Sequence, residues 1–210
     1  MTNEKFKNKF RIPSARATWH NYNAGTYFVT ICTANREHCF GEIITDDNDE
    51  PKMVLSGIGG YVEEQFKNAT VHYPYAEIPL WVVMPNHVHA IVRIDETKKI
   101  KNCRDAIVET MCTSSLQQTP TLHQPQKRWK NNIVNEQLQS ISHQRGLLST
   151  VIGGLKRSIT RYANTHAIPF TWQTRFHDHI VRNTDELNRI ATYILNNVAQ
   201  WESDKYHDVP

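Results

Sequence analysis

The chain has 210 residues, an apolar fraction of 39% and a formal net charge of +3 at pH 7, which predict one ordinary folded domain and exclude two independent cores of normal size. No run of about eighteen apolar residues is present, so a membrane-spanning helix is excluded, and the polar start MTNEKFKNKFR is unlike a secretory signal. We therefore expect a cytoplasmic protein with no membrane partner.

Two clusters of basic residues are candidates for contact with DNA. The first lies near the N-terminus and includes Arg11 and Arg16, and the second consists of Lys156, Arg157 and Arg161. Either cluster could line a phosphate backbone. The alternative is a solvated tail and a solvated helix face, which so small a net charge does not exclude.

The first part of the chain predicts a strand, a short helix and a hairpin. The segment TYFVTICTA over 26–34 is β-branched and aromatic, as is typical of a buried strand. A short helical stretch is expected over 60–69. The run PLWVVMPNHVHAIVRI contains two apolar stretches separated by Pro85 and Asn86, which predicts a hairpin, because proline fits a tight turn better than a central strand.

The second part begins with a polar stretch over about 95–146, which predicts a partly unstructured insertion. Apolar residues at helical spacing from Leu147 onward then predict a helix, and PFTWQTRFHDHIVRN suggests another strand. The closing NTDELNRIATYILNNVAQW predicts a helix with Asn183 as N-cap and Glu186 three residues later. This order predicts a single α+β domain over 1–210, an antiparallel sheet with helices packed on it.

The motif HVHAIV contains two histidines, His87 and His89, separated by one residue on a predicted strand. Both imidazoles therefore project from the same face and lie near enough to share one ion. Neutral imidazole binds Mn or Zn well, and it is acceptable to Mg when oxygens complete the shell. The alternative is the ordinary alternation of polar residues on a half-exposed strand, which produces most such pairs.

The C-terminal helix carries the second candidate group. Tyr193 and Asn197 lie one turn apart along one flank of the helix, beside a stripe expected to be buried, Leu187, Ile190, Ala191, Ile194 and Val198. If that flank meets the histidines, Tyr193 can present its phenol to a phosphate while the Asn197 amide oxygen completes a metal shell. The alternative is an amphipathic tyrosine at the rim of a core helix.

Four stretches in order along the chain resemble one known family: GTYFVTICTANREHCFGEI, VVMPNHVHAIV, WQTRFHDHIVRNTDEL and YILNNVAQWESD. With the segment GGLKRSITRYAN, they cover most of the chain outside the polar insertion. On these motifs the sequence resembles the REP-associated tyrosine transposases, relatives of the insertion-sequence-200-like transposases, in which the paired histidines form an HUH motif.

The resemblance implies a ferredoxin-like or RRM-like fold and cleavage of single-stranded DNA, at a hairpin, through a covalent phosphotyrosine. It assigns the metal ligands to His87, His89 and Asn197 and the nucleophile to Tyr193. We expect Mg or Mn as the ion and a monomer or homodimer as the assembly. The chain departs from the family pattern in two places: Val198 replaces a proline common after the asparagine, and the stretch over 95–146 exceeds the usual connection.

A second HxH pair, His177 and His179, is the main rival metal site. The resemblance gives it no metal role, so we interpret this segment as structural or DNA-facing. Two other functions stay open at this point. One is an RRM-like module that binds nucleic acid without cutting it, and the other is a metal-dependent hydrolase that uses an HxH site and in which Tyr193 is structural.

Overall fold

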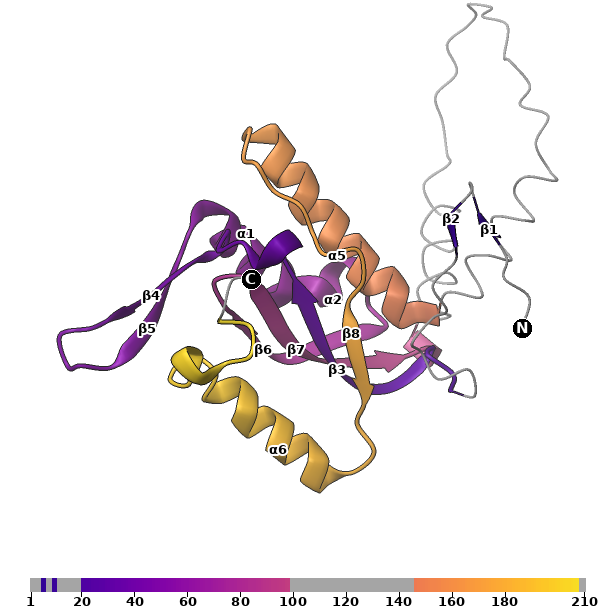
Figure 1. The fold of residues 1–210 in the computed structure, drawn as a ribbon. Coiled ribbons are helices and arrows are strands. Elements are labelled where there is room, and N and C mark those ends of the chain that lie inside the picture. Colours follow the sequence, from indigo (N-terminus) through magenta and orange to yellow (C-terminus); the bar gives the residue numbers. More distant parts are fainter. Residues whose placement is uncertain (1–4, 7–8, 11–19, 99–145, 208–210) are drawn as a thin grey trace, which may run out of the picture.

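The computed structural model describes residues 5–6, 9–10, 20–98 and 146–207. Its main feature is a four-stranded sheet in which every neighbouring pair is antiparallel (Figure 1). The strand order is β6-β7-β3-β8, with bounds Ala76–Val83, His87–Asp95, Ala24–Cys32 and His177–Ile180. This sheet confirms the predicted antiparallel α+β class.

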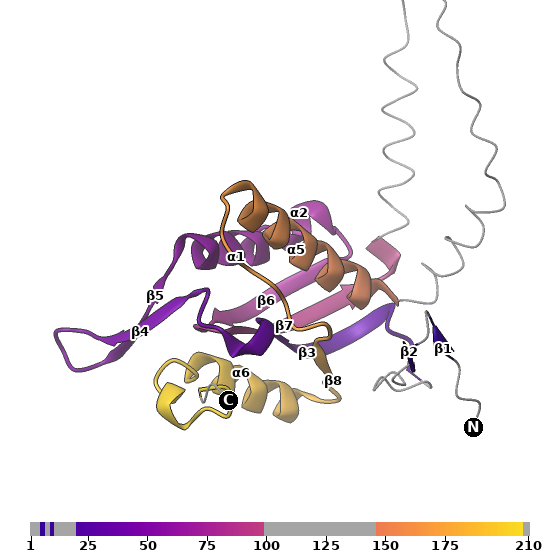
Figure 2. The ribbon, with the colours of Figure 1, turned by 45° about the horizontal axis from the view of Figure 1, so that its top comes forward.

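The helices α1 (Gly57–Lys67) and α5 (Gly146–Thr165) complete the chain order β3-α1-β6-β7-α5-β8. That order, with the strand arrangement above, is the topology of a ferredoxin-like fold. The short α2 (Ala69–His72) and α1 lie with α5 on one face of the sheet, and α6 (Thr184–Leu195) lies on the other (Figure 2). The ferredoxin-like prediction is therefore confirmed.

The two faces of the sheet are covered differently. Between the sheet and α1 and α5 lies a continuous apolar core, in which the fully buried side chains include Val29, Ile31, Val62, Phe66, Leu148, Ile152, Leu155 and Ile159. On the other face, Ile194 is the one residue of α6 that is buried, and the remaining apolar stripe of the helix is half-buried. Most of the hydrophobic stabilisation therefore comes from the α5 side.

Local signals set the elements that carry the candidate site. Pro85 and Asn86 form the predicted turn between β6 and β7, where the backbone amide of Met84 donates to the carbonyl of His87 over 2.8 Å. The Asn183 side chain accepts from the backbone amide of Glu186 over 2.8 Å, so the predicted N-cap of α6 is confirmed. The helix ends at Leu195, however, and Asn197 lies in the turn that follows it.

Several elements were not predicted from the sequence. β4 (Gly41–Thr45) and β5 (Pro51–Leu55) form a two-stranded arm beside the main sheet (Figure 1), and β1 (Lys5–Phe6) and β2 (Lys9–Phe10) form another pair. Two 3-10 turns, Ala34–Arg36 and Trp201–Ser203, were also missed. They are too short for a hydrophobic period to develop.

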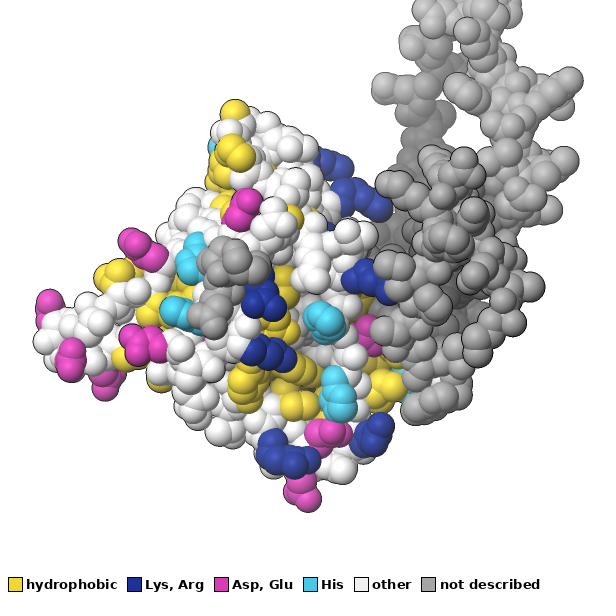
Figure 3. All heavy atoms as spheres, in the orientation of Figure 1, with side chains coloured by type: hydrophobic (Ala, Val, Ile, Leu, Met, Phe, Trp, Pro, Cys, Tyr) yellow, Lys and Arg dark blue, Asp and Glu magenta, His cyan; other side chains and the backbone are white. Residues whose placement is uncertain are grey.

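The predicted polar insertion over 95–146 lies almost wholly outside the described residues, so the single-domain interpretation stays a prediction. Among the described residues, every helix is too short or too polar to span a membrane. On the face where β8 and α6 lie, Lys, Arg and His side chains surround an exposed hydrophobic area (Figure 3).

One close approach in this fold can be tested. The backbone carbonyl of Phe40 lies so near Gly59 of α1 that a Cβ at this position would run into its oxygen, whereas nothing lies within 4 Å of a Cβ at Gly60. We predict that Gly59→Ala lowers the free energy of unfolding by about 1–3 kcal/mol, because backbone cannot move aside cheaply. Gly60→Ala should raise it by about 0.5–1 kcal/mol through helix propensity. Urea unfolding measures the free energy of unfolding of both variants. Equal changes in the two variants would contradict the close approach of Phe40 to Gly59.

Candidate metal centre and tyrosine site

The paired histidines of β7 are fully enclosed. His87 has 0% and His89 has 1% of its surface exposed, and the two ring centroids lie 4.5 Å apart. They share one face of the strand, as their spacing predicts, and that face is the one covered by α6. The predicted pair therefore lies inside the protein.

Each ring is held through its Nδ1 atom. His87 Nδ1 lies 2.8 Å from the side-chain oxygen of Asn86, whose amide nitrogen donates to the carbonyls of Arg36 and Tyr206. Because that oxygen can only accept, His87 Nδ1 carries the proton and its Nε2 presents a lone pair. His89 Nδ1 lies 2.8 Å from the Thr30 hydroxyl. This is how proteins commonly orient metal-binding histidines.

Burial also sets the charge of the pair. Loss of hydration lowers the pKa of His87 to about 3, and loss of hydration together with the neighbouring imidazole lowers that of His89 to about 2. Both rings are therefore neutral at pH 7, which is the form that binds a metal ion.

Tyr193 and Asn197 reach the histidines from the opposite side. The Tyr193 hydroxyl lies 3.1 Å from His89 Nε2, and its ring meets those of His89 and Phe28 with centroid distances of 5.2 and 6.1 Å. Asn197 is 1% exposed, although it follows the end of α6. The structure thus brings together the four residues to which the resemblance assigns the metal and the tyrosine.

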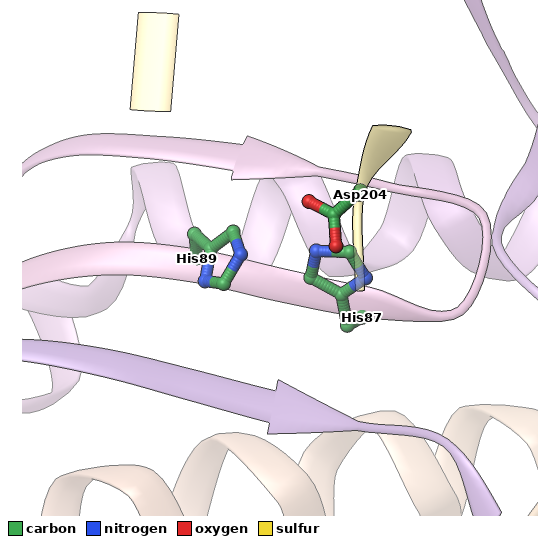
Figure 4. A group of neighbouring side chains, drawn as sticks. All are labelled: His87, His89 and Asp204. Atoms are coloured by element: carbon green, nitrogen blue, oxygen red, sulfur yellow. The ribbon is translucent and has the colours of Figure 1, made fainter. Parts of the chain in front are cut away.

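Asp204 was missed by the sequence analysis, yet its carboxylate lies beside the paired histidines (Figure 4). Its Oδ2 accepts from the Tyr193 hydroxyl over 3.3 Å and from the Asn197 amide over 3.1 Å. Its Oδ1 accepts from the backbone amide of Tyr206 over 2.8 Å. Helical periodicity could not identify Asp204, because a 3-10 turn precedes it and no helical period extends through that turn. The one sequence signal available for Asp204 was its place as the last residue of the stretch YILNNVAQWESD.

The donor set fits a divalent ion. His87, His89 and Asp204 each offer a ligand atom, all within 4.8 Å of one another, and this is the one such group among the residues described. Two atoms of the site, the His87 Nε2 ligand atom and the side-chain oxygen of Asn197, are buried without a hydrogen-bond partner in the described structure. Unpaired buried acceptors are costly, and a bound cation would satisfy both. Imidazole nitrogen with carboxylate and amide oxygen suits Mn, and Zn is also compatible.

The tyrosine itself is a weak nucleophile in this setting. Burial, followed by the nearby negative charge of Asp204, raises the pKa of Tyr193 to about 12. The phenol therefore keeps its proton at pH 7 unless positive charge is supplied beside it. It borders a cavity of about 360 Å³, whose lining includes Phe28, His89, Asn197, Asp204 and Lys205.

The predicted basic residues of α5 lie apart from this site, on the helix that covers the opposite face of the sheet. The Lys156 ammonium donates to the carbonyl of Gln173 over 2.7 Å and lies 5.4 Å from the ring centroid of Trp172, and burial lowers its pKa. Arg157 and Arg161 are exposed along an open groove. The other predicted DNA-binding residues, Arg11 and Arg16, lie outside the described residues.

The rival histidine pair differs from the first. His177 and His179 are both exposed on β8, and His179 Nε2 lies 2.7 Å from a carboxylate oxygen of Glu186. Neither belongs to a group of three potential metal ligands among the described residues. The geometry therefore favours His87 and His89 as the metal pair.

The fold and the site define an α+β protein with a candidate His-His-Asp metal centre beside a tyrosine. Comparison with models of known protein families gives no match. The chain is 31% identical over 196 residues to an uncharacterized protein of Haemophilus influenzae, and the match covers 92% of each chain. The chain belongs to the same family as this Haemophilus protein.

Two solved structures are also similar to the chain. One is a REP-associated tyrosine transposase bound to a REP hairpin, with a TM-score of 0.43 and 17% identity over 88% of this chain and 72% of the other. The second, from Deinococcus radiodurans and provisionally described as a transposase, has a TM-score of 0.34 and 11% identity over 87% of this chain and 97% of the other. Similarity at this level carries no argument about activity.

The two buried imidazoles predict an acid-sensitive fold. In the unfolded chain they take up protons near pH 6.5, whereas in the folded chain they do so only near pH 3 or below. Their contribution to stability is therefore complete above pH 6.5 and is lost as the pH falls toward 3. Urea unfolding of His89→Gln across this window should show a weaker pH dependence than the wild type.

The matched control for this measurement is His72→Gln, which changes an exposed histidine of α2. It should keep the pH dependence of the wild type. Equal pH dependence in His89→Gln and the wild type would show that burial of this imidazole is not the source of the acid sensitivity.

Proposed function

We propose that this protein is a metal-dependent tyrosine transposase that cuts and rejoins single-stranded DNA through a covalent 5′-phosphotyrosine. The observation that carries the proposal is the convergence of Tyr193 and Asn197, from the C-terminal part of the chain, on the paired histidines of β7. A structural tyrosine at the rim of a helix has no need of a buried polar group opposite it. The ordered resemblance to the REP-associated tyrosine transposases supports the same assignment.

The reaction needs one nucleophile and one leaving oxygen. The Tyr193 oxygen attacks the scissile phosphorus, the bond to the 3′-oxygen breaks, and that oxygen leaves as a 3′-hydroxyl after taking up a proton. The phenolic proton is lost from Tyr193 in the same step. Because the new link is still a phosphodiester, a second 3′-hydroxyl can attack it and join strands without ATP.

The residues around Tyr193 prepare this step. Asn86 and Thr30 hold the two imidazoles with their Nε2 atoms toward the tyrosine side, and Asp204 accepts the phenolic hydrogen bond. A divalent ion, Mg or Mn, held by His87, His89 and Asn197, with Asp204 as a further oxygen, would polarise the phosphate and neutralise developing charge. Because the pKa of Tyr193 is raised, such a charge beside the phenol would favour the attack.

The substrate is single-stranded DNA, and the family resemblance points to a strand beside a hairpin. Arg157 and Arg161 are exposed on α5 and suit a phosphate backbone on that side of the molecule, as Arg11 and Arg16 are predicted to do. The ammonium of Lys156 already contacts Gln173 and Trp172, so its part in DNA binding would be smaller. The active assembly is a monomer or a homodimer.

The role of Tyr193 as the nucleophile can be tested by removing its hydroxyl. Tyr193→Phe should abolish nicking and the protein–DNA adduct while leaving DNA binding intact, because only the attacking oxygen is removed. The substrate is single-stranded DNA copied from beside the gene, incubated with Mg or Mn and analysed on a denaturing gel that preserves covalent adducts. The control is Tyr162→Phe, a tyrosine of α5 that stacks on Tyr61. Adduct formation by Tyr193→Phe would refute the assignment.

The role of His87 as a metal ligand can be tested by removing its imidazole. His87→Ala should lose metal-dependent cleavage and the rise in melting temperature that Mn gives the wild type, because one nitrogen ligand is missing. His72→Ala, exposed on α2, should retain both. Cleavage by a folded His87→Ala protein would rule out the ligand role. The same gel distinguishes the alternatives, since neither a binding module nor a hydrolase forms an adduct.

A further inference from the structure

The second histidine pair lies on the same face of the sheet as the first. In the register of β3, Thr30 is opposite His89 on one side and His177 on the other, while Phe28 is opposite Ile91 and His179. Directly opposed residues of antiparallel strands project from the same face. His177 and His179 therefore project on the side where Tyr193 and α6 lie.

The two β8 histidines differ in their partners. His179 is bound to Glu186 over 2.7 Å, and the other carboxylate oxygen of Glu186 accepts from the backbone amide of Arg182. This contact ties β8 to the first turn of α6. His177 is exposed, and within the described structure its side chain takes part in no hydrogen bond or ion pair. Its ring is free to meet a ligand.

Phe28 connects the cavity at Tyr193 to this strand. Its half-buried ring stacks on His89 with a centroid distance of 5.1 Å and lines the cavity beside Tyr193. Its position on β3 is next to that of Thr30, two residues along the same face, and so adjoins the position of His177. The Phe28 ring at the cavity and the His177 ring on the edge strand therefore project from one face of the sheet, at diagonal positions of β3 and β8.

The charge of this face suits a polyanion. Figure 3 shows Lys, Arg and His side chains around its exposed hydrophobic area, with some Asp and Glu side chains also at the border. Lys205 lines the cavity, Arg182 lies two residues after the end of β8, and Arg189 is exposed on α6. Flat rings bordered by cations are the features by which proteins hold single-stranded nucleic acid, because bases stack on the rings while phosphates meet the charges.

We propose that Phe28 and His177 form a track for the single strand that enters or leaves the tyrosine cavity, with one base stacked on the His177 ring. This inference rests on the proposed function and adds a binding residue to it. A duplex cannot use the track in the same way, because its bases are stacked on one another. His179 serves instead to hold α6 in place through Glu186.

The test measures binding separately from cleavage. All proteins carry Tyr193→Phe, and the probe is fluorescein-labelled oligothymidine of about 20 nucleotides, which exceeds the site size of one single-strand-binding fold and forms no hairpin. Fluorescence anisotropy gives the dissociation constant. His177→Ala should weaken binding roughly tenfold, the range expected for one stacked base, and His177→Phe should restore it to within about twofold. His166→Ala, exposed beyond the end of α5, is the matched control and should bind like the parent.

Three results would overturn the track: unchanged affinity in His177→Ala, no measurable binding of oligothymidine by the parent, or an equal loss of affinity for a fully paired duplex. The failure of the proposed function looks different. If the wild-type protein forms no covalent adduct but His177→Ala loses single-strand affinity, the track stands and the cleavage reaction falls. If the adduct forms and His177→Ala binds normally, the reaction stands and the track falls.

Discussion

Two neutral imidazoles buried side by side are the constraint on which the rest of this structure depends. Their Nδ1 atoms form hydrogen bonds with Asn86 and Thr30. The Nε2 atoms of His87 and His89, on the other side of the rings, can therefore bind one ion together. A buried acceptor without a partner is costly, and His87 Nε2 is in that position. The fold therefore maintains an arrangement that stability alone does not favour, which is common at functional sites.

The two faces of the sheet have different roles: the face under α5 contributes most to stability, and the face under α6 carries the candidate site. The α5 side is an apolar core, whereas the α6 side buries polar groups, including Thr30 and Asn197. Because α6 buries only Ile194 completely, its position depends on polar contacts at both ends. Glu186 binds His179 near the start of the helix, and Tyr193 and Asn197 meet Asp204 beyond its end. A few hydrogen bonds therefore determine the position of α6, and with it the position of Tyr193.

The positive charge of the molecule is divided between its two sides. Arg157 and Arg161 belong to the helix on one face, and the residues around the tyrosine cavity, such as Lys205, belong to the other. In the proposed reaction, DNA that contacts α5 would therefore pass an edge of the sheet before it reaches Tyr193. β8 is such an edge strand, and it carries His177, the residue proposed to hold the single strand.

The sequence by itself determined the features that depend on near neighbours. The strand at Thr26, the turn at Pro85, the N-cap at Asn183 and the shared face of His87 and His89 follow from local spacing and backbone preference, and all are found. Its ordered motifs also predicted that Tyr193 and Asn197 act with the histidines, although spacing alone favoured a structural tyrosine.

Only the tertiary structure decided which distant groups meet. The tertiary structure brings Asp204 to Tyr193 and places Lys156 beside Trp172 rather than at the tyrosine site. It also places His177 and His179 on the same face of the sheet as His87 and His89. Such contacts join residues far apart in the chain, and they arise from strand register and helix packing. No periodicity records them, because the same local pattern is compatible with many global arrangements until the core is packed.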